Sequence, residues 1–230
     1  MSKYINKGFL VFDFDGTIIH LFKNYNLRET IKIMCDEMKQ YDVDFSSGQD
    51  VFDVFGEIVR QTEGRLEVRE AAFINADKVI VNAEMEATSN VELVTGVDKV
   101  FPHLLELGYA VGIATNNSVE CVKKCLADYK LLTSMPIVGR IGNKPELLKP
   151  NSWTILEVAR QMGCEPTNVI FIGDNPRDYV AALNAGCKFI GIVPTKQKKE
   201  RMVKVLPESK MTEDFNGILD LVEETLKNDR

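Results

Sequence analysis

The chain contains 230 residues, 45% of them hydrophobic, and is therefore long enough to bury a sizeable core. Its formal net charge of −6 at pH 7 gives no general attraction to nucleic acid or to an anionic membrane surface, so neither partner is expected. No apolar run approaches the ~20 residues that a membrane span needs, and five scattered cysteines without a CxxC pair favour reduced thiols, so we expect a cytoplasmic protein.

The first predicted element is a buried strand at 8–14, where GFLVFDF combines aromatic and branched residues. Apolar residues then recur at helical spacing over 26–41 and again over 51–59. A third stretch, 67–87, also favours a helix, although its VIV triplet suits a strand as well. Residues 22–92 are therefore expected to form an all-helical block, which is too long to be a loop.

Strands and helices alternate from residue 97 onward. We expect strands at 109–114, 137–139, 168–173 and 188–193, together with a helix that stops at Gly108 and helices at 118–129, 152–162, 177–185 and 214–227. This alternation implies right-handed crossovers and a parallel sheet covered on both faces. The predicted fold class is α/β, a doubly wound parallel sheet with a helical insertion after its first strand.

The chain has one basic cluster, KQKKER at 196–201, between the last predicted strand and the last predicted helix. The cluster is short and lacks interleaved aromatic residues. We therefore interpret it as a solvated face rather than as a binding patch.

Two aspartates interrupt the apolar run LVFDFDGTII at the end of the first strand. Residues i and i+2 of an extended segment point to the same side, so Asp13 and Asp15 would converge on one spot. Two buried like charges at such close range need a cation or a hydrogen-bonded site around them. The stretch therefore predicts a cation or a hydrogen-bonded site at this place, which other residues of the chain must help to form.

Further polar residues follow other strands at the same edge of the sheet, where open α/β folds bind their ligands. They are Thr115 and Asn116 after the strand at 109–114, Lys149 in LLKP, and Asp174 and Asp178 in GDNPRD after the strand at 168–173. Each alone has a structural explanation, as a turn residue, a surface lysine or a helix start with Asn175 as N-cap and Pro176 in the first position. Their coincidence at one edge favours a functional site.

Four motifs together resemble the haloacid dehalogenase superfamily, in its phosphatase branch: DFDGT (13–17), IATNN (113–117), LLKPNSW around Lys149, and GDNPRD (173–178). The resemblance spans nearly the whole chain and implies a Rossmann-like core formed by residues 1–21 and 93–230. The insertion, 22–92, resembles the helical cap domain of the phosphoglycolate phosphatase and β-phosphoglucomutase group. Lys149 fits the lysine motif better than Lys144, which remains the second choice.

The resemblance also implies a metal site and two catalytic carboxylates. Mg²⁺ would be held by Asp13, the backbone carbonyl of Asp15 and Asp174, with Asp178 ligating directly or through water. Asp13 would attack phosphorus to give an aspartyl-phosphate, and Asp15 would protonate the leaving oxygen and later deprotonate the hydrolytic water. The phosphoryl oxygens would be held by Gly16, Thr115, Asn116 and Lys149.

These roles predict a Mg²⁺-dependent phosphatase that hydrolyses a small phosphorylated metabolite, phosphoglycolate-like or a sugar phosphate. The acid/base Asp15 argues against a dehalogenase, which lacks it. Two alternatives stay open: a phosphomutase of the β-phosphoglucomutase type, and a non-enzymatic signalling module that is phosphorylated on aspartate. A monomer and a homodimer are both compatible with the sequence.

The cap would select the substrate by closing over the site. Its foremost candidate is Arg65 in the loop QTEGR, ahead of Arg60, Arg69 and Lys23. His20 stands where the resembling family often has an acidic residue, five positions after Asp15. We assign His20 no catalytic role and expect it in a hinge or in packing.

Overall fold

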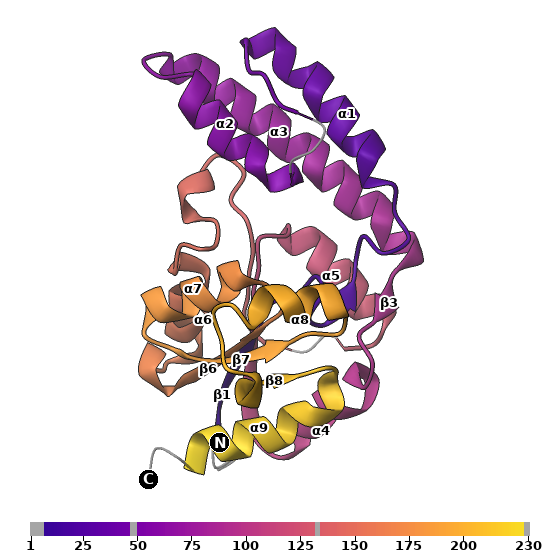
Figure 1. Ribbon diagram of the computed structural model, residues 1–230, viewed down its shortest axis with the longest axis vertical. Helices are drawn as coiled ribbons and strands as arrows, with labels where there is room; N and C mark the ends of the chain where they lie inside the picture. The colour runs from indigo at the N-terminus through magenta and orange to yellow at the C-terminus, as the bar shows by residue number, and fades with distance from the viewer. Residues whose placement is uncertain (1–6, 47–49, 132–133, 228–230) are drawn as a thin grey trace.

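The computed structural model describes residues 7–46, 50–131 and 134–227. A six-stranded sheet runs through its lower half (Figure 1), with the strands in the spatial order β5 (Ile137–Val138), β4 (Tyr109–Ala114), β1 (Gly8–Phe12), β6 (Val169–Gly173), β7 (Lys188–Ile192) and β8 (Met211–Thr212). Every neighbouring pair in this sheet is parallel. The predicted α/β class and the doubly wound parallel sheet are confirmed.

The chain winds outward from β1 in both directions, first through β4 and β5 and later through β6, β7 and β8. The carboxyl end of β1 is therefore the topological switch point, where parallel sheets of this kind bind ligands. The strand predicted at 8–14 ends at Phe12, so Asp13 is the first residue beyond it.

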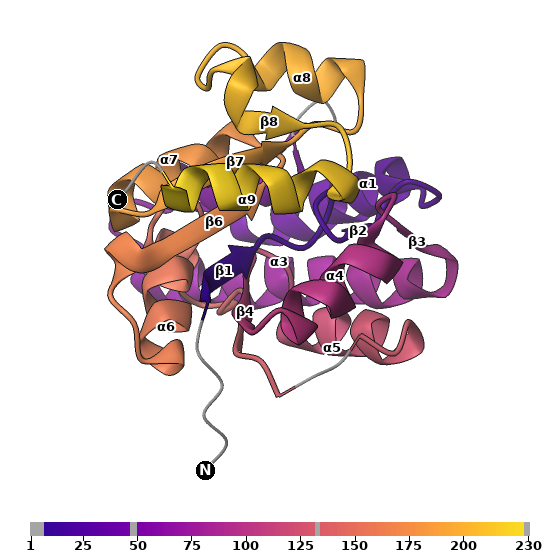
Figure 2. The same ribbon diagram turned by 90° about the horizontal axis from the view of Figure 1, so that it is seen from below.

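Helices cover both faces of the sheet (Figure 2): α4 (Val97–Glu106), α5 (Val119–Asp128), α6 (Trp153–Met162), α7 (Pro176–Ala185), α8 (Lys196–Met202) and α9 (Ile218–Lys227). Alternation along β1 assigns the faces, because Leu10 and Phe12 pack with α4, α5 and α9, whereas Val11 packs with α6, α7 and α8. None of the helices in the described part of the chain is long and apolar enough to cross a membrane.

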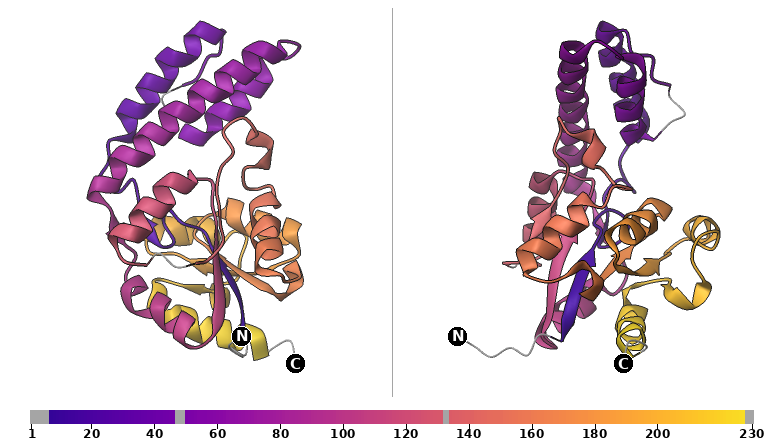
Figure 3. Two further views of the ribbon diagram at one scale, coloured as in Figure 1. Left: turned by 180° about the vertical axis from the view of Figure 1, so that it is seen from behind. Right: turned by 90° about the vertical axis from the view of Figure 1, so that its left-hand side faces the viewer.

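A helical unit lies beyond the carboxyl ends of the strands in both views of Figure 3. It contains α1 (Leu27–Met38), α2 (Val54–Gln61) and α3 (Leu66–Ala87), and these helices bury an apolar cluster of their own that includes Met34, Phe55 and Ile80. The ambiguous VIV triplet belongs to α3. Its register buries Ala76, Ile80 and Ala83, which is the spacing of a helix face.

A short antiparallel ribbon marks the place where the chain leaves the sheet unit and returns to it. Its strands are β2 (Ile19–His20) and β3 (Glu92–Leu93), with His20 opposite Glu92. His20 therefore lies in the connection, as expected for a hinge or packing residue. The proposed limits of the helical unit, 22–92, stay a prediction.

Seven single-turn 3-10 helices complete the described elements: η1 (Lys39–Tyr41), η2 (Val51–Asp53), η3 (Thr88–Asn90), η4 (Pro145–Leu147), η5 (Pro166–Asn168), η6 (Glu208–Lys210) and η7 (Phe215–Gly217). Of these, η2 matters for the site, because it lies at the edge of the helical unit that faces the sheet. Its N-cap Asp50 accepts a hydrogen bond from the backbone N–H of Phe52 and fixes this turn.

Candidate active site

A cavity of about 220 Å³ opens at the carboxyl edge of the sheet. Its walls combine strand ends of the sheet unit with η2 of the helical unit, and it is lined by Asp13, Asp15, Asp50, Phe52, Thr115, Asn116, Asn117, Lys149, Asp174, Asn175, Arg177, Asp178 and Lys198. The structure thus brings together seven of the sequence-predicted site residues: Asp13, Asp15, Thr115, Asn116, Lys149, Asp174 and Asp178. The cavity size suits a small ligand.

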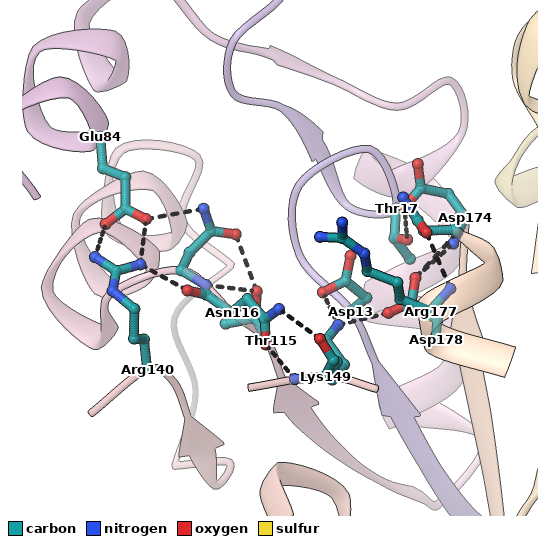
Figure 4. A network of polar contacts seen from close by, with 12 residues as sticks. Asp13, Thr17, Glu84, Thr115, Asn116, Arg140, Lys149, Asp174, Arg177 and Asp178 are labelled. Carbon is teal, nitrogen blue, oxygen red and sulfur yellow. Dashed lines mark hydrogen bonds and ion pairs between the residues drawn. The ribbon is translucent and has the colours of Figure 1, made fainter. Parts of the chain in front are cut away.

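Lys149 joins two of the predicted carboxylates (Figure 4). Its Nζ donates to Oδ1 of Asp13 at 2.5 Å and to Oδ1 of Asp178 at 2.6 Å, and all three side chains are buried. Burial alone would lower the pKa of Lys149, but the two carboxylates outweigh it and the pKa is raised. Lys149 is therefore a charged ammonium beside Asp13, whereas Lys144 is exposed and lies outside the cavity lining.

Asp178 holds the start of α7 as well as Lys149. Asn175 is the N-cap, Pro176 is the first helical residue, and Oδ2 of Asp178 accepts from the backbone N–H of Asn175 at 3.0 Å in a capping box. The helix start predicted from the sequence is confirmed. The same carboxylate turns its other oxygen to Lys149, so the structural and the functional interpretation both apply to it.

Three carboxylates form a buried cluster that can hold a cation. Asp13, Asp174 and Asp178 each offer one oxygen, and these oxygens lie within 4.8 Å of one another. Burial raises the pKa of Asp174 and of Asp178 above the ordinary value, because the charged form of each is poorly solvated. Buried oxygen donors of this kind fit a hard divalent cation such as Mg²⁺.

Asp15 lies beside this cluster, in the turn after β1. Its Oδ1 accepts a hydrogen bond from the backbone N–H of Leu21 at 2.8 Å, and its side chain lines the cavity. Burial is the main reason that its pKa is raised to about 6, although the Leu21 N–H and nearby Lys198 act in the opposite direction. A carboxyl group with such a pKa can both donate and accept a proton near neutral pH.

Gly16 allows the turn after β1 to pass close to the acidic cluster. Its φ of +86° lies in the left-handed region, and a Cβ there would run into the carboxylate of Asp174 and the Nζ of Lys198. The neighbouring Thr17 donates its hydroxyl to Oδ1 of Asp174 at 3.4 Å. The DFDGT segment is therefore shaped around Asp174 as well as around its own aspartates.

The loop after β4 positions the backbone of Lys149. Asn116 accepts from the N–H of Lys149 at 2.8 Å through Oδ1, and it donates to the carbonyl of Lys149 at 3.3 Å through Nδ2. Thr115 is fully buried and donates its hydroxyl to Oδ1 of Asn117 at 2.9 Å. The polar residues predicted at this strand end thus lie beside the lysine.

Arg65 is not brought to the cavity. It precedes α3 in the turn between α2 and α3, which lies at the end of the helical unit farthest from the sheet in Figure 1, and its guanidinium pairs with Asp42. The lesser candidates also have contacts elsewhere: Arg60 with Glu57, Arg69 with Thr62, and Lys23 with Glu92. A role of Arg65 in substrate selection stays a prediction.

The comparison with known proteins agrees with this geometry. A family model described as haloacid dehalogenase-like hydrolase matches residues 10–192. The chain belongs to this family. The predicted family and enzyme class, a hydrolase with phosphatase-named relatives, are both confirmed.

Two relatives differ in how much of the chain they match. A Clostridium perfringens protein named as the pyrophosphatase PpaX is 26% identical over 222 residues, which cover 93% of this chain and 96% of that protein. A phosphoglycolate phosphatase of Haemophilus influenzae is 30% identical over 103 residues, 44% of either protein. The matched names do not favour the phosphomutase or the signalling alternative.

Solved structures of the haloacid dehalogenase type share the fold over almost the whole chain. A predicted phosphatase from Clostridium acetobutylicum superposes with a TM-score of 0.67 at 17% identity, covering 94% of this chain and 98% of that one. A predicted phosphoglycolate phosphatase from Haemophilus somnus gives a TM-score of 0.59 at 20% identity, covering 94% and 97%. At these identities the likeness concerns the fold.

Lys198 was missed by the sequence reasoning, which assigned its basic cluster to a solvated face. That interpretation is wrong for this residue, because α8 turns Lys198 into the cavity, where its Nζ contacts Oδ2 of Asp174. The signal was present, since Lys198 follows closely on β7 and strand ends carry the site in this hydrolase fold.

Arg140 was missed as well, and it connects the helical unit with the site of this hydrolase (Figure 4). Its guanidinium donates to Asp77 and Glu84 on α3, at 2.6 and 2.9 Å, and to the backbone carbonyl of Asn116 at 2.6 Å. Glu84 also accepts from Nδ2 of Asn117 at 3.1 Å. No local sequence pattern marks these residues, whose contacts depend on how α3 packs against the loop after β5.

Proposed function

We propose that this haloacid dehalogenase-like hydrolase is a Mg²⁺-dependent phosphatase that acts on a small phosphorylated metabolite through an aspartyl-phosphate on Asp13. The observation that carries the proposal is the arrangement of Lys149 between Asp13 and Asp178, beside Asp174, at the carboxyl edge of the sheet. A charged lysine next to three carboxylates provides both attraction for phosphate and ligands for a cation.

The metal ligands proposed are the carboxylates of Asp13, Asp174 and Asp178 together with the backbone carbonyl of Asp15. The donor set fits Mg²⁺, because all four groups are oxygens and the three carboxylates are buried and close together. Bound there, Mg²⁺ would supply positive charge against the phosphoryl oxygens. The remaining chemistry belongs to the residues of the chain.

Asp13 is the proposed nucleophile, because it is the first residue beyond β1 and its carboxylate faces the cavity. Its oxygen forms a bond to phosphorus while the bond from phosphorus to the leaving oxygen breaks. Asp15 gives a proton to that leaving oxygen and then takes one from the water that hydrolyses the aspartyl-phosphate. Its pKa of about 6 suits both steps.

The phosphoryl oxygens are proposed to be held by Lys149, the hydroxyl of Thr115 and backbone N–H groups near Gly16 and Asn116. Lys149 supports this assignment by its position beside the nucleophile. Lys149 now donates to Asp13 and Asp178, and the hydroxyl of Thr115 donates to Asn117, so we propose that a bound phosphoryl group redirects these donors to its own oxygens.

The helical unit is proposed to act as a cap, residues 22–92, over a core formed by 1–21 and 93–230. Asp50 and Phe52 from this unit line the cavity, which supports a closed site for a small substrate. We further propose that the enzyme is cytoplasmic, that its substrate is an intracellular phosphorylated metabolite, and that it is a monomer or a homodimer.

The decisive experiment uses Asp15→Asn with p-nitrophenyl phosphate and Mg²⁺. Nitrophenolate leaves without a proton, so the variant should still phosphorylate Asp13 but hydrolyse the adduct about 10²- to 10⁴-fold more slowly. We expect a burst of about one nitrophenol per active site and a phosphate that mass spectrometry locates on Asp13.

Asp13→Asn should show neither burst nor turnover, and EDTA should abolish turnover of the wild type. Asp128→Asn is the matched control, because Asp128 is an exposed aspartate on α5. Normal steady-state turnover by Asp15→Asn without a trapped adduct, or turnover by Asp13→Asn, would refute the mechanism.

A further inference from the structure

Lys198 is held in the cavity by the sheet unit itself. The strands β6 and β7 pair with Gly173 opposite Gly191, so the segments that follow them lie side by side. Thr195 caps α8 by accepting from the backbone N–H of Lys198 at 3.2 Å. The side chain then reaches Asp174, the residue directly after β6.

The Nζ of Lys198 lies against the turn after β1 as well as against Asp174. A Cβ added to Gly16 would collide with this Nζ, which places it against the turn that carries Asp15. Asp15 is the proposed proton donor to the leaving oxygen. Lys198 is thus close to the leaving group, whereas Lys149 bonds to the nucleophile Asp13.

Three cationic side chains line the cavity, and two of them are already committed. Lys149 is buried between Asp13 and Asp178, and Arg177 pairs with Asp53 at 2.8 Å. Lys198 differs, because it pairs with a single carboxylate, that of Asp174, and its side chain is 30% exposed, whereas Lys149 is 4% exposed and pairs with two carboxylates. A divalent cation on Asp174 would compete with Lys198 for that carboxylate and leave its ammonium available to another anion.

We propose that Lys198 binds a second anionic group of the substrate, carried by the leaving group. This inference rests on the proposed phosphatase function and narrows its substrate class to compounds with a phosphate or a carboxylate close to the transferred phosphoryl group. Pyrophosphate and 2-phosphoglycolate are the smallest examples of the two chemistries. A sugar phosphate with a neutral leaving group would not use this contact.

The size and position of the site agree with such substrates. A cavity of about 220 Å³ admits a compact compound with two anionic groups, and Lys198 reaches it from a short helix of the sheet unit, so recognition of the second anion does not require the far end of the helical unit. With pyrophosphate, Asp13 would take one phosphoryl group, the bridging P–O bond would break, and inorganic phosphate would leave beside Lys198.

The test compares kcat/KM on pyrophosphate, 2-phosphoglycolate and propyl phosphate, whose leaving group is neutral. Lys198→Met should lower kcat/KM for one or both of the anion-bearing substrates by about 10- to 100-fold relative to propyl phosphate, mainly through KM, because a charge-assisted hydrogen bond is lost. Lys198→Arg keeps the charge and should restore most of the preference. Lys196→Met is the matched control, since that side chain on the same helix is 91% exposed.

A binding measurement gives a second readout that does not depend on turnover. With Mg²⁺ present, Lys198→Met should weaken calorimetric binding of methylenediphosphonate by about tenfold more than binding of methylphosphonate. A selective loss on pyrophosphate alone assigns the second group as phosphate, and a loss on phosphoglycolate alone assigns it as carboxylate.

Two results would overturn the inference: equal losses on all three substrates, or a changed affinity for Mg²⁺ without any change in substrate preference. Neither result touches the proposed phosphatase function, which fails separately if Asp13→Asn retains turnover. Circular dichroism of Lys198→Met checks that the variant is folded.

Discussion

Two of the ion pairs between the helical unit and the sheet unit differ in depth. At the base of α3, the guanidinium of Arg140 is 1% exposed and pairs with Glu84, which is fully buried. At the rim of the cavity, Arg177 pairs with Asp53 of η2, and these side chains are 42% and 37% exposed. The two pairs have similar distances, 2.9 and 2.8 Å, but Arg140 is buried and also donates to Asp77 and to the carbonyl of Asn116.

The difference in burial separates a fixed connection from one that can open. Breaking a buried pair leaves an uncompensated charge in a medium that solvates it poorly, whereas water replaces either partner of an exposed pair at little cost. The base of α3 should therefore stay attached to the sheet unit. The rim contact at η2 should release and re-form at little cost, which would let η2 move when substrate enters the cavity.

The buried contact also connects to Asp13, the proposed nucleophile. Arg140 donates to the carbonyl of Asn116, the side chain of Asn116 holds both backbone polar groups of Lys149, and Lys149 donates to Asp13. Four residues from four separate segments are thus connected in series. The packing of α3 against the sheet unit consequently helps to fix the geometry beside Asp13.

The largest expected effect comes from Glu84→Gln. The change keeps the shape of the side chain but removes one of the two carboxylate charges that balance Arg140, the other being that of Asp77, and it turns an amide N–H towards a donor of Asn117 or Ser118. We expect a loss of about 2 to 3 kcal/mol in the free energy of unfolding, because a hydrogen bond to a charged group is lost while Asp77 still pairs with Arg140. Urea unfolding measures it as a lower midpoint at unchanged slope.

Glu86→Gln is the matched control for this measurement. Glu86 lies two residues further along α3, is exposed, and accepts a hydrogen bond from the hydroxyl of Tyr25. Its replacement should change the stability by less than about 0.5 kcal/mol. If the two variants unfold at the same urea concentration, the buried junction does not fix the base of α3.

A smaller effect on stability, with a larger one on catalysis, is expected for Asn116→Ala. The variant loses two hydrogen bonds to the backbone of Lys149, which together contribute about 1 to 2 kcal/mol. A displaced Lys149 should lower kcat by about 10- to 100-fold, because catalysis depends on positioning at the scale of 1 Å.

Asn184→Ala tests whether the loss of any hydrogen bond to the loop around Lys149 and Pro150 lowers kcat in the same way. Asn184 donates to the carbonyl of Pro150, the residue after Lys149, from the exposed side of the loop. Its loss should leave kcat within about twofold of the wild type and the free energy of unfolding within about 0.5 kcal/mol. A similar fall in kcat for both variants would remove the specific role of Asn116.

The sequence predicted those parts of the site that follow from local rules. The i, i+2 spacing of Asp13 and Asp15, and the capping pattern around Asp178, depend on a few neighbouring residues, and the structure places the first pair in the cavity and confirms the helix start. The alternation of strands and helices likewise depends on local periodicity, and it led to the correct parallel sheet.

The remaining features depend on packing between distant segments. In the sequence, Glu84 is one of many polar residues in a long predicted helix, and its partner Arg140 is 56 residues away in the chain. Lys198 was misassigned because its short helix carries several lysines, and only the direction of α8 relative to β7 selects the one that enters the cavity. The direction of α8 cannot be deduced from charge or composition.

The smallest expected effect concerns the exposed ion pair between Arg177 and Asp53. A double-mutant cycle with Arg177→Gln and Asp53→Asn isolates the coupling energy between the two side chains. Asp53 also accepts from the backbone N–H of Asp50 in a capping box, and the cycle subtracts this contribution because the loss of the capping contact is common to the single and the double variant.

The coupling should amount to about 0.2 to 1 kcal/mol, the usual range for exposed ion pairs. It should also fall towards zero when the salt concentration rises from about 0.05 to about 1 M, because the screening length shortens to about 3 Å at 1 M. A cycle with Glu84→Gln and Arg140→Met should give a larger coupling that hardly responds to salt, since both partners are shielded from the solvent. A rim coupling above about 2 kcal/mol that persists in 1 M salt would mean that η2 is bound as firmly as the base of α3, and substrate would then have to enter without release of this contact.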